Sequence, residues 1–149
     1  MIAVVQRVSK ASVTIDEVKK AEIGIGLLIL VGIEDEDNEE DVLWLSQKLV
    51  NLRIFSDEED KMNLSVKDVG GSALIVSQFT LHASTKKGNR PSFIKAARPE
   101  KAIPVYEEFI QSVETQGVRV QTGEFGANMQ IGLLNDGPVT VVIDTKNKV

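Results

Sequence analysis

An uninterrupted apolar run, Ile23–Ile33, constrains the fold of this chain more than any other feature of its sequence. Every residue in it is aliphatic or glycine. A helix that spans a bilayer needs about 20 such residues, so the run is too short to cross a membrane. Its composition favours a buried β-strand instead. Because 149 residues can enclose such a strand in a core, we expect residues 1–149 to form a single domain.

Further segments have the composition of short strands, with turn-forming residues between most of them. The expected strands are Ile2–Val8, Ser12–Ile15, Ser72–Leu81, Val118–Gln121, Met129–Leu134 and Val139–Ile143. Ser9-Lys10-Ala11 is expected to form the turn between the first two strands.

Two other segments have the spacing of amphipathic helices. Asn38 can cap the first helix, whose apolar face carries Val42, Leu45, Leu49 and Leu52. The second is expected from about Glu100 to Thr115, with Pro104 in its first turns, where proline is tolerated. Strands outnumber helices, so we predict an α+β fold: a compact, largely antiparallel, barrel-like sheet with two covering helices.

The supply of metal-binding and nucleophilic side chains is small. The chain has no cysteine, which excludes disulfides and thiol nucleophiles, and His82 is its only histidine. This leaves too few ligands for a zinc site of the usual kind, so we expect no metal and no cofactor. The first residues do not have the pattern of a cleaved signal, and we expect a cytoplasmic protein without a membrane partner.

The distribution of charge is more informative than the net charge of -5. The net charge argues against a general nucleic-acid coat, and no DNA partner is expected. The acidic residues of 34–41 suit the start of the first helix. Six cations lie in a segment whose only acidic residue is Glu100: Lys86, Lys87, Arg90, Lys95, Arg98 and Lys101. This basic segment either contacts phosphates or is ordinary solvated surface.

Polar residues follow directly on the apolar strand Ala73–Val76. A serine triad at Ser77 would need His82, but no Gly-x-Ser-x-Gly turn surrounds the serine. If the strand continues, His82 lies more than about 10 Å away on the opposite face, so we expect a surface or loop histidine. Without a base, backbone N–H groups could stabilise an oxyanion on an activated substrate. Alternatively, the hydroxyls of Ser77 and Thr80 only satisfy one another or the backbone.

Asn135-Asp136-Gly137-Pro138 is dense in turn-forming residues. One interpretation is a simple tight turn. The other is a cis Gly137-Pro138 bond that directs two carbonyl groups into a pocket, and the sequence does not decide between them.

Together, Ser77-Gln78-Phe79-Thr80-Leu81 and Asn135-Asp136-Gly137-Pro138-Val139-Thr140 resemble the signature of the D-aminoacyl-tRNA deacylase family. Further segments match in the same order: Gln6-Arg7-Val8, Arg53-Ile54-Phe55-Ser56-Asp57, Lys61-Met62-Asn63-Leu64, Arg90-Pro91-Ser92-Phe93 and Gln121-Thr122-Gly123. The resemblance extends from Met1 to about Ile143. Residues 144–149 carry no family signal and are expected to form a loose polar tail.

The resemblance implies a homodimer that hydrolyses the ester of D-aminoacyl-tRNA and of glycyl-tRNA. The expected catalytic residues are Ser77, Gln78, Phe79 and Thr80. Backbone N–H groups around Gln78 and Phe79 would bind the ester carbonyl, and Thr80 would position the substrate. The 2′-hydroxyl of the terminal adenosine would assist, which fits the missing acid–base machinery.

The resemblance also implies how the enantiomers are distinguished. Gly137-Pro138 would be cis and reach into the partner's pocket, where its carbonyls exclude L-aminoacyl groups. Arg7 would hold that loop in place, and Met129 would line the pocket. Lys86, Lys87 and Arg90 would contact the acceptor end of the tRNA.

Two other functions remain open on the sequence. One is a tRNA-binding module without catalysis, which the basic segment alone would explain. The other is a small-molecule esterase that depends on Ser77 and His82. Neither explains Gly137-Pro138.

Overall fold

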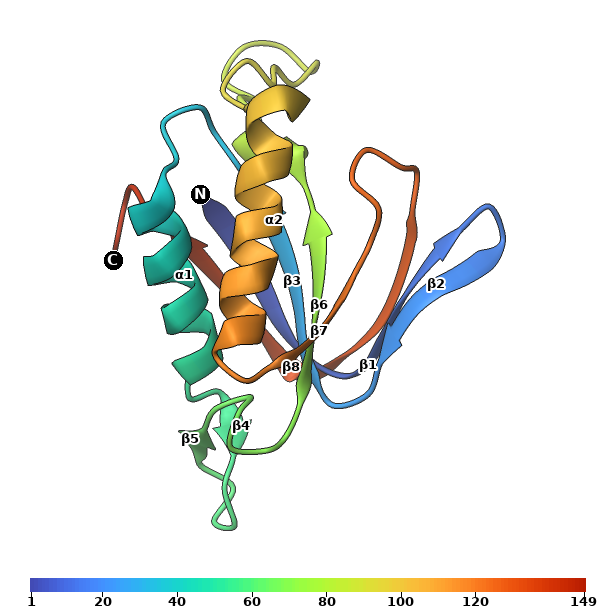
Figure 1. Cartoon of the computed structure of the whole chain (residues 1–149), viewed down its shortest axis with the longest axis vertical. Coiled ribbons are helices and arrows are strands. Elements are labelled where there is room, and N and C mark those ends of the chain that lie inside the picture. Colours follow the sequence, from blue (N-terminus) through green and yellow to red (C-terminus); the bar gives the residue numbers. More distant parts are fainter.

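The computed structural model describes all residues, 1–149, as two packed helices that cover one face of a strongly curled sheet (Figure 1). The expected α+β fold, with two helices and a barrel-like sheet, is confirmed. The six strands of the main sheet are β1 (Ile2–Ile15), β2 (Val18–Ile23), β3 (Gly26–Gly32), β6 (Ser72–Ser77), β7 (Arg119–Thr122) and β8 (Gln130–Asp144). The other elements are α1 (Glu39–Asn51), β4 (Phe55–Ser56), β5 (Met62–Leu64), the 3₁₀-helix η1 (Phe79–His82) and α2 (Pro99–Thr115).

The sheet is mixed, and the long strand β1 is at its centre. β1 pairs antiparallel with β2, β3 and β8, whereas β3–β6 and β6–β7 are parallel pairs. The β1–β2 hairpin curls round until β2 also approaches β6 and β7. The sheet therefore nearly closes into a barrel.

The strand boundaries differ from the sequence prediction in several places, and the strands expected at Met129–Leu134 and Val139–Ile143 form the single strand β8. No turn interrupts β1 at Ser9–Ala11, because β8 pairs with β1 on both sides of this segment. The apolar run Ile23–Ile33 is divided between β2 and β3 by a bend at Gly24-Ile25, and both strands pair antiparallel with β1. At the start of β3 the backbone of Gly26 lies so close to Ser72 that a Cβ atom would overlap the carbonyl of Ser72.

Both helices form where they were expected. The Asn38 side chain accepts hydrogen bonds from the first turn of α1, and Asp41 reciprocates by accepting from the backbone of Asn38. This capping box satisfies N–H groups that the helix itself cannot pair. α2 ends at Thr115 and tolerates Pro104 in its first turns. Neither helix is long and apolar enough to cross a membrane.

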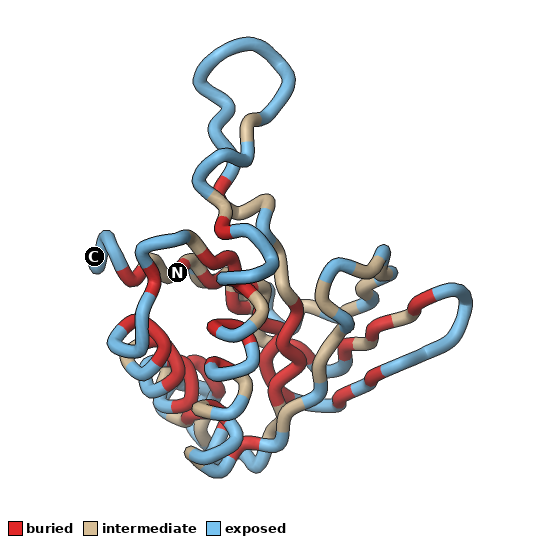
Figure 2. Tube along the Cα trace, turned by 45° about the horizontal axis from the view of Figure 1, so that its top comes forward, coloured by how far each residue is buried: buried red, intermediate tan, exposed pale blue.

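Apolar side chains gather in two clusters on opposite faces of the sheet strands. The larger cluster lies between the helices and the sheet, and its members Leu45, Ile75 and Phe109 are fully buried. Figure 2 shows buried residues along the helices and the strands they cover. The smaller cluster lies inside the curl of the sheet around Val13 and Leu74. The end of β6 lies between the two clusters, which fixes the residues that follow it.

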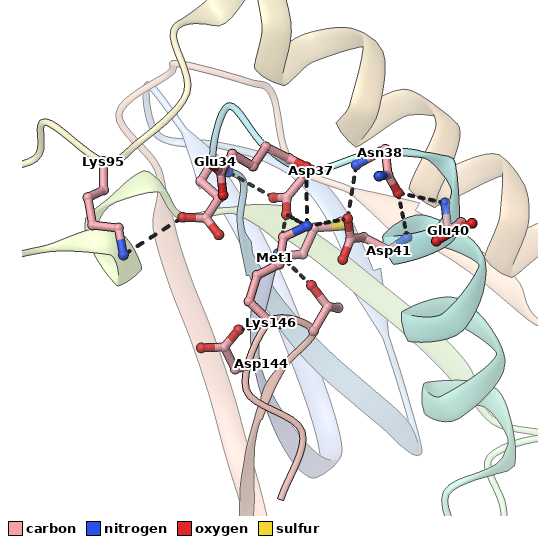
Figure 3. A network of polar contacts seen from close by, with 11 residues as sticks. Met1, Glu34, Asp37, Asn38, Glu40, Asp41, Lys95, Asp144 and Lys146 are labelled. Carbon is pink, nitrogen blue, oxygen red and sulfur yellow. Dashed lines mark hydrogen bonds and ion pairs between the residues drawn. The ribbon is translucent and has the colours of Figure 1, made fainter.

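The C-terminal residues do not form the loose tail that the sequence suggested. Thr145 is buried: its N–H donates to the Met1 carbonyl at 2.9 Å, and its hydroxyl accepts from the Met1 nitrogen at 2.8 Å. The Lys146 ammonium lies 2.9 Å from the Asp41 carboxylate (Figure 3). Lys148 lies over the Trp44 ring at 4.6 Å from its centroid. These contacts attach the tail to Met1 and to α1.

Candidate functional site

A cavity of about 280 Å³ opens where β6 ends. One wall is formed by the end of β6 and the start of η1, and the facing wall by the segment between β7 and β8. Ten of its fourteen lining residues are hydrophobic. The lining includes Val76, Ser77, Gln78, Phe79, Phe125 and Met129.

The chain leaves the sheet at Ser77 rather than continuing as a strand to Leu81. The Gln78 N–H donates to the Val31 carbonyl at 2.8 Å, and the chain then turns into η1. Gly32 allows this close approach, since a Cβ atom there would lie 2.9 Å from the carbonyl oxygen of Gln78. The predicted strand is therefore wrong beyond Ser77, and Phe79 begins a helical turn at the mouth of the cavity.

Two N–H donors can serve a substrate at this wall. Because the backbone N–H of Gln78 is already bonded to Val31, it is not the free donor that the sequence suggested. Phe79 is the first residue of η1, and the first N–H groups of a helix have no partner within it. The side-chain amide of Gln78 donates to the Thr80 hydroxyl at 2.6 Å and retains a second hydrogen. Thr80 thereby orients Gln78.

No ionisable side chain lines the cavity. His82, expected at the surface or in a loop, is buried in η1, and its Nε2 has no hydrogen-bond partner. The buried Tyr106 hydroxyl lies behind the wall and donates to the Ile75 carbonyl at 3.0 Å. Burial raises the pKa of Tyr106 to about 12, so this hydroxyl keeps its proton at neutral pH. The cavity can orient and polarise a substrate, but its walls supply no general base.

Gly137-Pro138 lies in a wide bulge of β8 rather than in a tight turn between two strands. Asn135 pairs with Val8 and Thr140 with Gln6, so four residues of β8 stand opposite Arg7 alone. The Gly137-Pro138 peptide bond is cis.

Arg7 attaches this bulge to the rest of the fold. Its Nε donates to the Asp136 carbonyl at 3.0 Å, and its Nη1 donates to the Ile54 carbonyl at 2.8 Å. The Asp136 carboxylate lies 3.4 Å from the same Nε and completes the contact. Arg7 is therefore placed to hold the bulge.

The predicted site residues fall into two groups within one chain. Ser77, Gln78, Phe79 and Met129 share the cavity, and Thr80 joins them through Gln78. The second group, Arg7, Gly137 and Pro138, does not line this cavity.

Most of the basic segment lies in a loop between η1 and α2 that projects beyond the body of the molecule, whereas Lys101 lies within α2 (Figures 1 and 2). Lys86, Lys87 and Arg90 are all exposed. The Phe93 ring meets the Phe79 ring edge to face, with 5.2 Å between centroids. This contact joins the loop to the mouth of the cavity.

Several lining residues were not found from the sequence. Phe125, Gly126, Ala127 and Asn128 form much of the facing wall, yet they belong to no recognisable motif. The neighbouring Gln121-Thr122-Gly123, noted only as a family match, was the nearest signal. No group of three histidine, aspartate or glutamate side chains could hold a metal ion.

Comparison with known proteins places these observations in a family. The family model described as D-Tyr-tRNA(Tyr) deacylase matches residues 4–144. The D-aminoacyl-tRNA deacylase of Flavobacterium psychrophilum is 63% identical, and that of Parabacteroides distasonis 61%, each match covering 99% of both chains.

Two solved structures have the same fold. One, titled c-Myc DNA Unwinding Element Binding Protein, has a TM-score of 0.91 at 40% identity and covers 97% of this chain and 98% of its own. The other, titled a probable eukaryotic D-amino acid tRNA deacylase, has a TM-score of 0.80 at 19% identity and covers 95% and 97%. The family model and the full-length relatives agree: the chain belongs to the D-aminoacyl-tRNA deacylase family.

Proposed function

We propose that this deacylase hydrolyses D-aminoacyl-tRNA and glycyl-tRNA by orienting an already reactive ester, without a side-chain acid or base. The observation that carries the proposal is the cavity wall, which offers N–H donors and hydroxyls but no ionisable group. An ester between an amino acid and a ribose hydroxyl is activated enough for stabilisation of its oxyanion to suffice. Ser77, Gln78, Phe79 and Thr80 are the proposed catalytic and positioning residues.

In the proposed reaction, water attacks the ester carbonyl carbon. The carbonyl oxygen becomes an oxyanion, which the Phe79 N–H and the Gln78 side-chain amide stabilise. The bond from carbon to the ribose 3′-oxygen then breaks, which releases the free D-amino acid and leaves a 3′-hydroxyl on the tRNA. The neighbouring 2′-hydroxyl, as both donor and acceptor, carries the proton from the attacking water to the leaving oxygen.

Chiral selection is proposed to come from a second subunit. In a homodimer the Gly137-Pro138 bulge of one protomer would enter the cavity of its partner. Main-chain carbonyls there would hold the substrate's ammonium group and obstruct an L side chain, while glycine and D-residues enter. Support comes from the Arg7 anchors, which fix a bulge that does not line its own cavity. Such selection works by excluding correctly charged L-aminoacyl-tRNA from the cavity.

The basic loop is proposed to contact the acceptor end of the tRNA. Lys86, Lys87 and Arg90 are exposed, and the Phe79–Phe93 contact brings their loop to the cavity mouth. Their cations would meet the phosphates of the acceptor stem. Because charged tRNA is used by ribosomes, we also propose that the protein acts in the cytoplasm.

Hydrolysis of matched D- and L-tyrosyl-tRNA tests the activity and its selectivity together. The purified protein should release D-tyrosine from the first and leave the second intact, and it should also deacylate glycyl-tRNA. Equal cleavage of both enantiomers, or cleavage of neither, would contradict the proposal.

A second candidate is a nucleic-acid-binding protein without turnover. The exposed basic loop favours it, and one structural neighbour has a title that describes DNA binding. This candidate predicts salt-sensitive binding of tRNA or duplex DNA that is lost in a triple variant of Lys86, Lys87 and Arg90, with no ester cleavage.

A small-molecule esterase that depends on His82 is a third candidate. Replacing His82 with alanine should leave D-tyrosyl-tRNA hydrolysis near normal, since this side chain does not line the cavity. A large loss of kcat in a folded His82→Ala variant would instead favour the esterase.

A further inference from the structure

Met129 is held in the cavity wall by the absence of a side chain at Gly123. A Cβ atom on Gly123 would lie only 2.5 Å from the Met129 sulfur and 3.6 Å from its terminal methyl carbon. Carbon atoms in contact sit about 3.5–4.0 Å apart, and sulfur is larger, so the thioether occupies the space that any other residue at position 123 would fill. The Met129 sulfur therefore packs directly against Gly123.

Gly123 is itself fixed in place from behind. It follows β7 directly, and its N–H donates to the Ile75 carbonyl at 3.2 Å. The same carbonyl accepts from the Tyr106 hydroxyl at 3.0 Å. Gly123 therefore cannot move away from Met129 without breaking its hydrogen bond to Ile75 in β6, the strand that ends at Ser77.

Met129 has one direction in which it can move. On one side it packs against the buried cluster inside the sheet, and Val76 closes the same side. On the other side is the cavity, which Met129 lines together with Ser77, Gln78 and Phe79. A thioether pushed off Gly123 must enter that space. The side chain is flexible, so the fold would tolerate the move.

We propose that the Gly123–Met129 contact sets the depth of the cavity beside the ester-binding wall, and that Gly123 is a positioning residue for the reaction. This inference rests on the proposed function, because it assigns the ester to the wall of Ser77, Gln78 and Phe79. The contact limits the space that is left for the ester group of the substrate. All aminoacyl-tRNAs share this group, so the effect should not depend on the amino-acid side chain.

Gly123→Ala is the direct test, since position 123 does not have the left-handed backbone conformation that would strain alanine. The added methyl group should displace the Met129 sulfur by about 1 Å or more. We expect kcat/KM to fall about 10- to 100-fold, as misplacements of that size do, and equally for D-tyrosyl-tRNA and glycyl-tRNA.

Rescue separates positioning from a general loss of structure. In Gly123→Ala/Met129→Ala the displaced thioether is gone, so kcat/KM should return to the level of Met129→Ala alone, a non-additivity typical of residues in contact. Gly24→Ala is the matched control, because a Cβ atom there would meet nothing within 4 Å. An unchanged Gly123→Ala variant, or a loss that the double variant does not relieve, would overturn the inference.

The position of the Met129 side chain can also be followed by NMR without any catalysis, so this inference can be tested separately from the proposed function. The chain has three methionines, so ¹³C-methyl labelling gives one signal each for Met1, Met62 and Met129. In Gly123→Ala only the Met129 signal should move, and an amide-linked, non-hydrolysable D-tyrosyl-adenosine should perturb it less than in the wild type. If the wild-type protein cleaved no aminoacyl-tRNA, the proposed function would fail, while an unmoved Met129 signal would overturn this inference alone.

Discussion

Gly137 has a backbone conformation that residues with a side chain rarely adopt, with φ at +127°. A Cβ atom there would lie 2.9 Å from the Arg7 guanidinium, so the clash would fall on the group that anchors the bulge. The residues themselves left open whether Gly137-Pro138 forms a tight turn or a cis bond that faces a pocket, and the family motif favoured the second interpretation. Composition alone would have assigned Asn135–Pro138 to a tight turn, because no neighbouring residue in the sequence shows that Arg7 of β1 lies opposite this segment of β8.

Gly137→Ala should therefore displace the bulge and reduce chiral selectivity. We expect the ratio of D- to L-tyrosyl-tRNA hydrolysis to fall at least about tenfold, since an ångström-scale shift of a positioning group has effects of that order. The measurement is the ratio of kcat/KM for the two enantiomers.

Gly70→Ala is a suitable control for this substitution. Gly70 also has a positive φ, +66°, but a Cβ atom there would meet nothing within 4 Å. The control should lose some stability and keep its selectivity. Unchanged discrimination between the enantiomers in a folded Gly137→Ala variant would argue against a chiral gate, meaning a Gly137-Pro138 bulge that excludes L-aminoacyl groups.

The first turn of α1 shows how far local sequence determines an element. Asn38 and the apolar spacing behind it predicted the start of the helix, because a capping box uses only neighbouring residues. Lys146, which pairs with Asp41 from the other end of the chain, was not predictable from local pattern. The lengths of β1 and β8 escaped prediction for the same reason: each is extended by its long-range partner.

Asp41 links α1 to the C-terminal tail through its charge. Burial raises the pKa of this carboxyl, but hydrogen bonds from Lys146, Thr145 and the Asn38 N–H outweigh burial and hold it at about 2. The unfolded value of 3.8 is higher, so the ionised carboxylate stabilises the fold above pH 4 and loses this effect as the pH falls towards 2.

Asp41→Asn should lower the free energy of unfolding by about 2 kcal/mol at pH 7, because the variant loses the charged contacts that hold the pKa of Asp41 at about 2. The difference from the wild type should shrink from pH 4 downwards. Urea unfolding from pH 7 to pH 3 measures it. Glu40→Gln, on the exposed side of the same turn, should change stability by less than about 0.5 kcal/mol. A pH-independent difference for Asp41→Asn would contradict the electrostatic account.

At the scale of the whole molecule, the fold separates the two groups of predicted site residues. The order of strands puts the end of β6 and the bulge of β8 on different parts of the sheet, on either side of β1 and β3. The class of fold was predictable, because alternating strands and two amphipathic helices can be recognised from periodicity. The cavity was not, since its facing wall, Phe125–Met129, is brought to β6 by the long-range pairing of β7 with β6.

If the gate acts across a dimer, two defective chains should complement each other. We expect a heterodimer of Gln78→Ala/Thr80→Ala with Gly137→Ala to hydrolyse D-tyrosyl-tRNA and reject the L-enantiomer. Its one intact cavity, on the Gly137→Ala subunit, would receive an intact gate from its partner. Co-expressed chains with two different affinity tags allow the heterodimer to be isolated.

The opposite arrangement gives an opposite result. If each cavity used its own Gly137, the only competent cavity in the heterodimer would have the altered gate, and L-tyrosyl-tRNA would be cleaved. A chain that is monomeric at assay concentration would also contradict the cross-subunit gate, and sedimentation at several concentrations detects it.

The cavity wall without ionisable side chains has a consequence for inhibition. Reagents that acylate or alkylate serines, cysteines or histidines depend on a nucleophile that a neighbouring base activates. This wall offers none, so such compounds should leave the enzyme active at concentrations that inactivate serine hydrolases. Useful inhibitors would have to imitate the shape and charge of the tetrahedral intermediate, with a ribose attached.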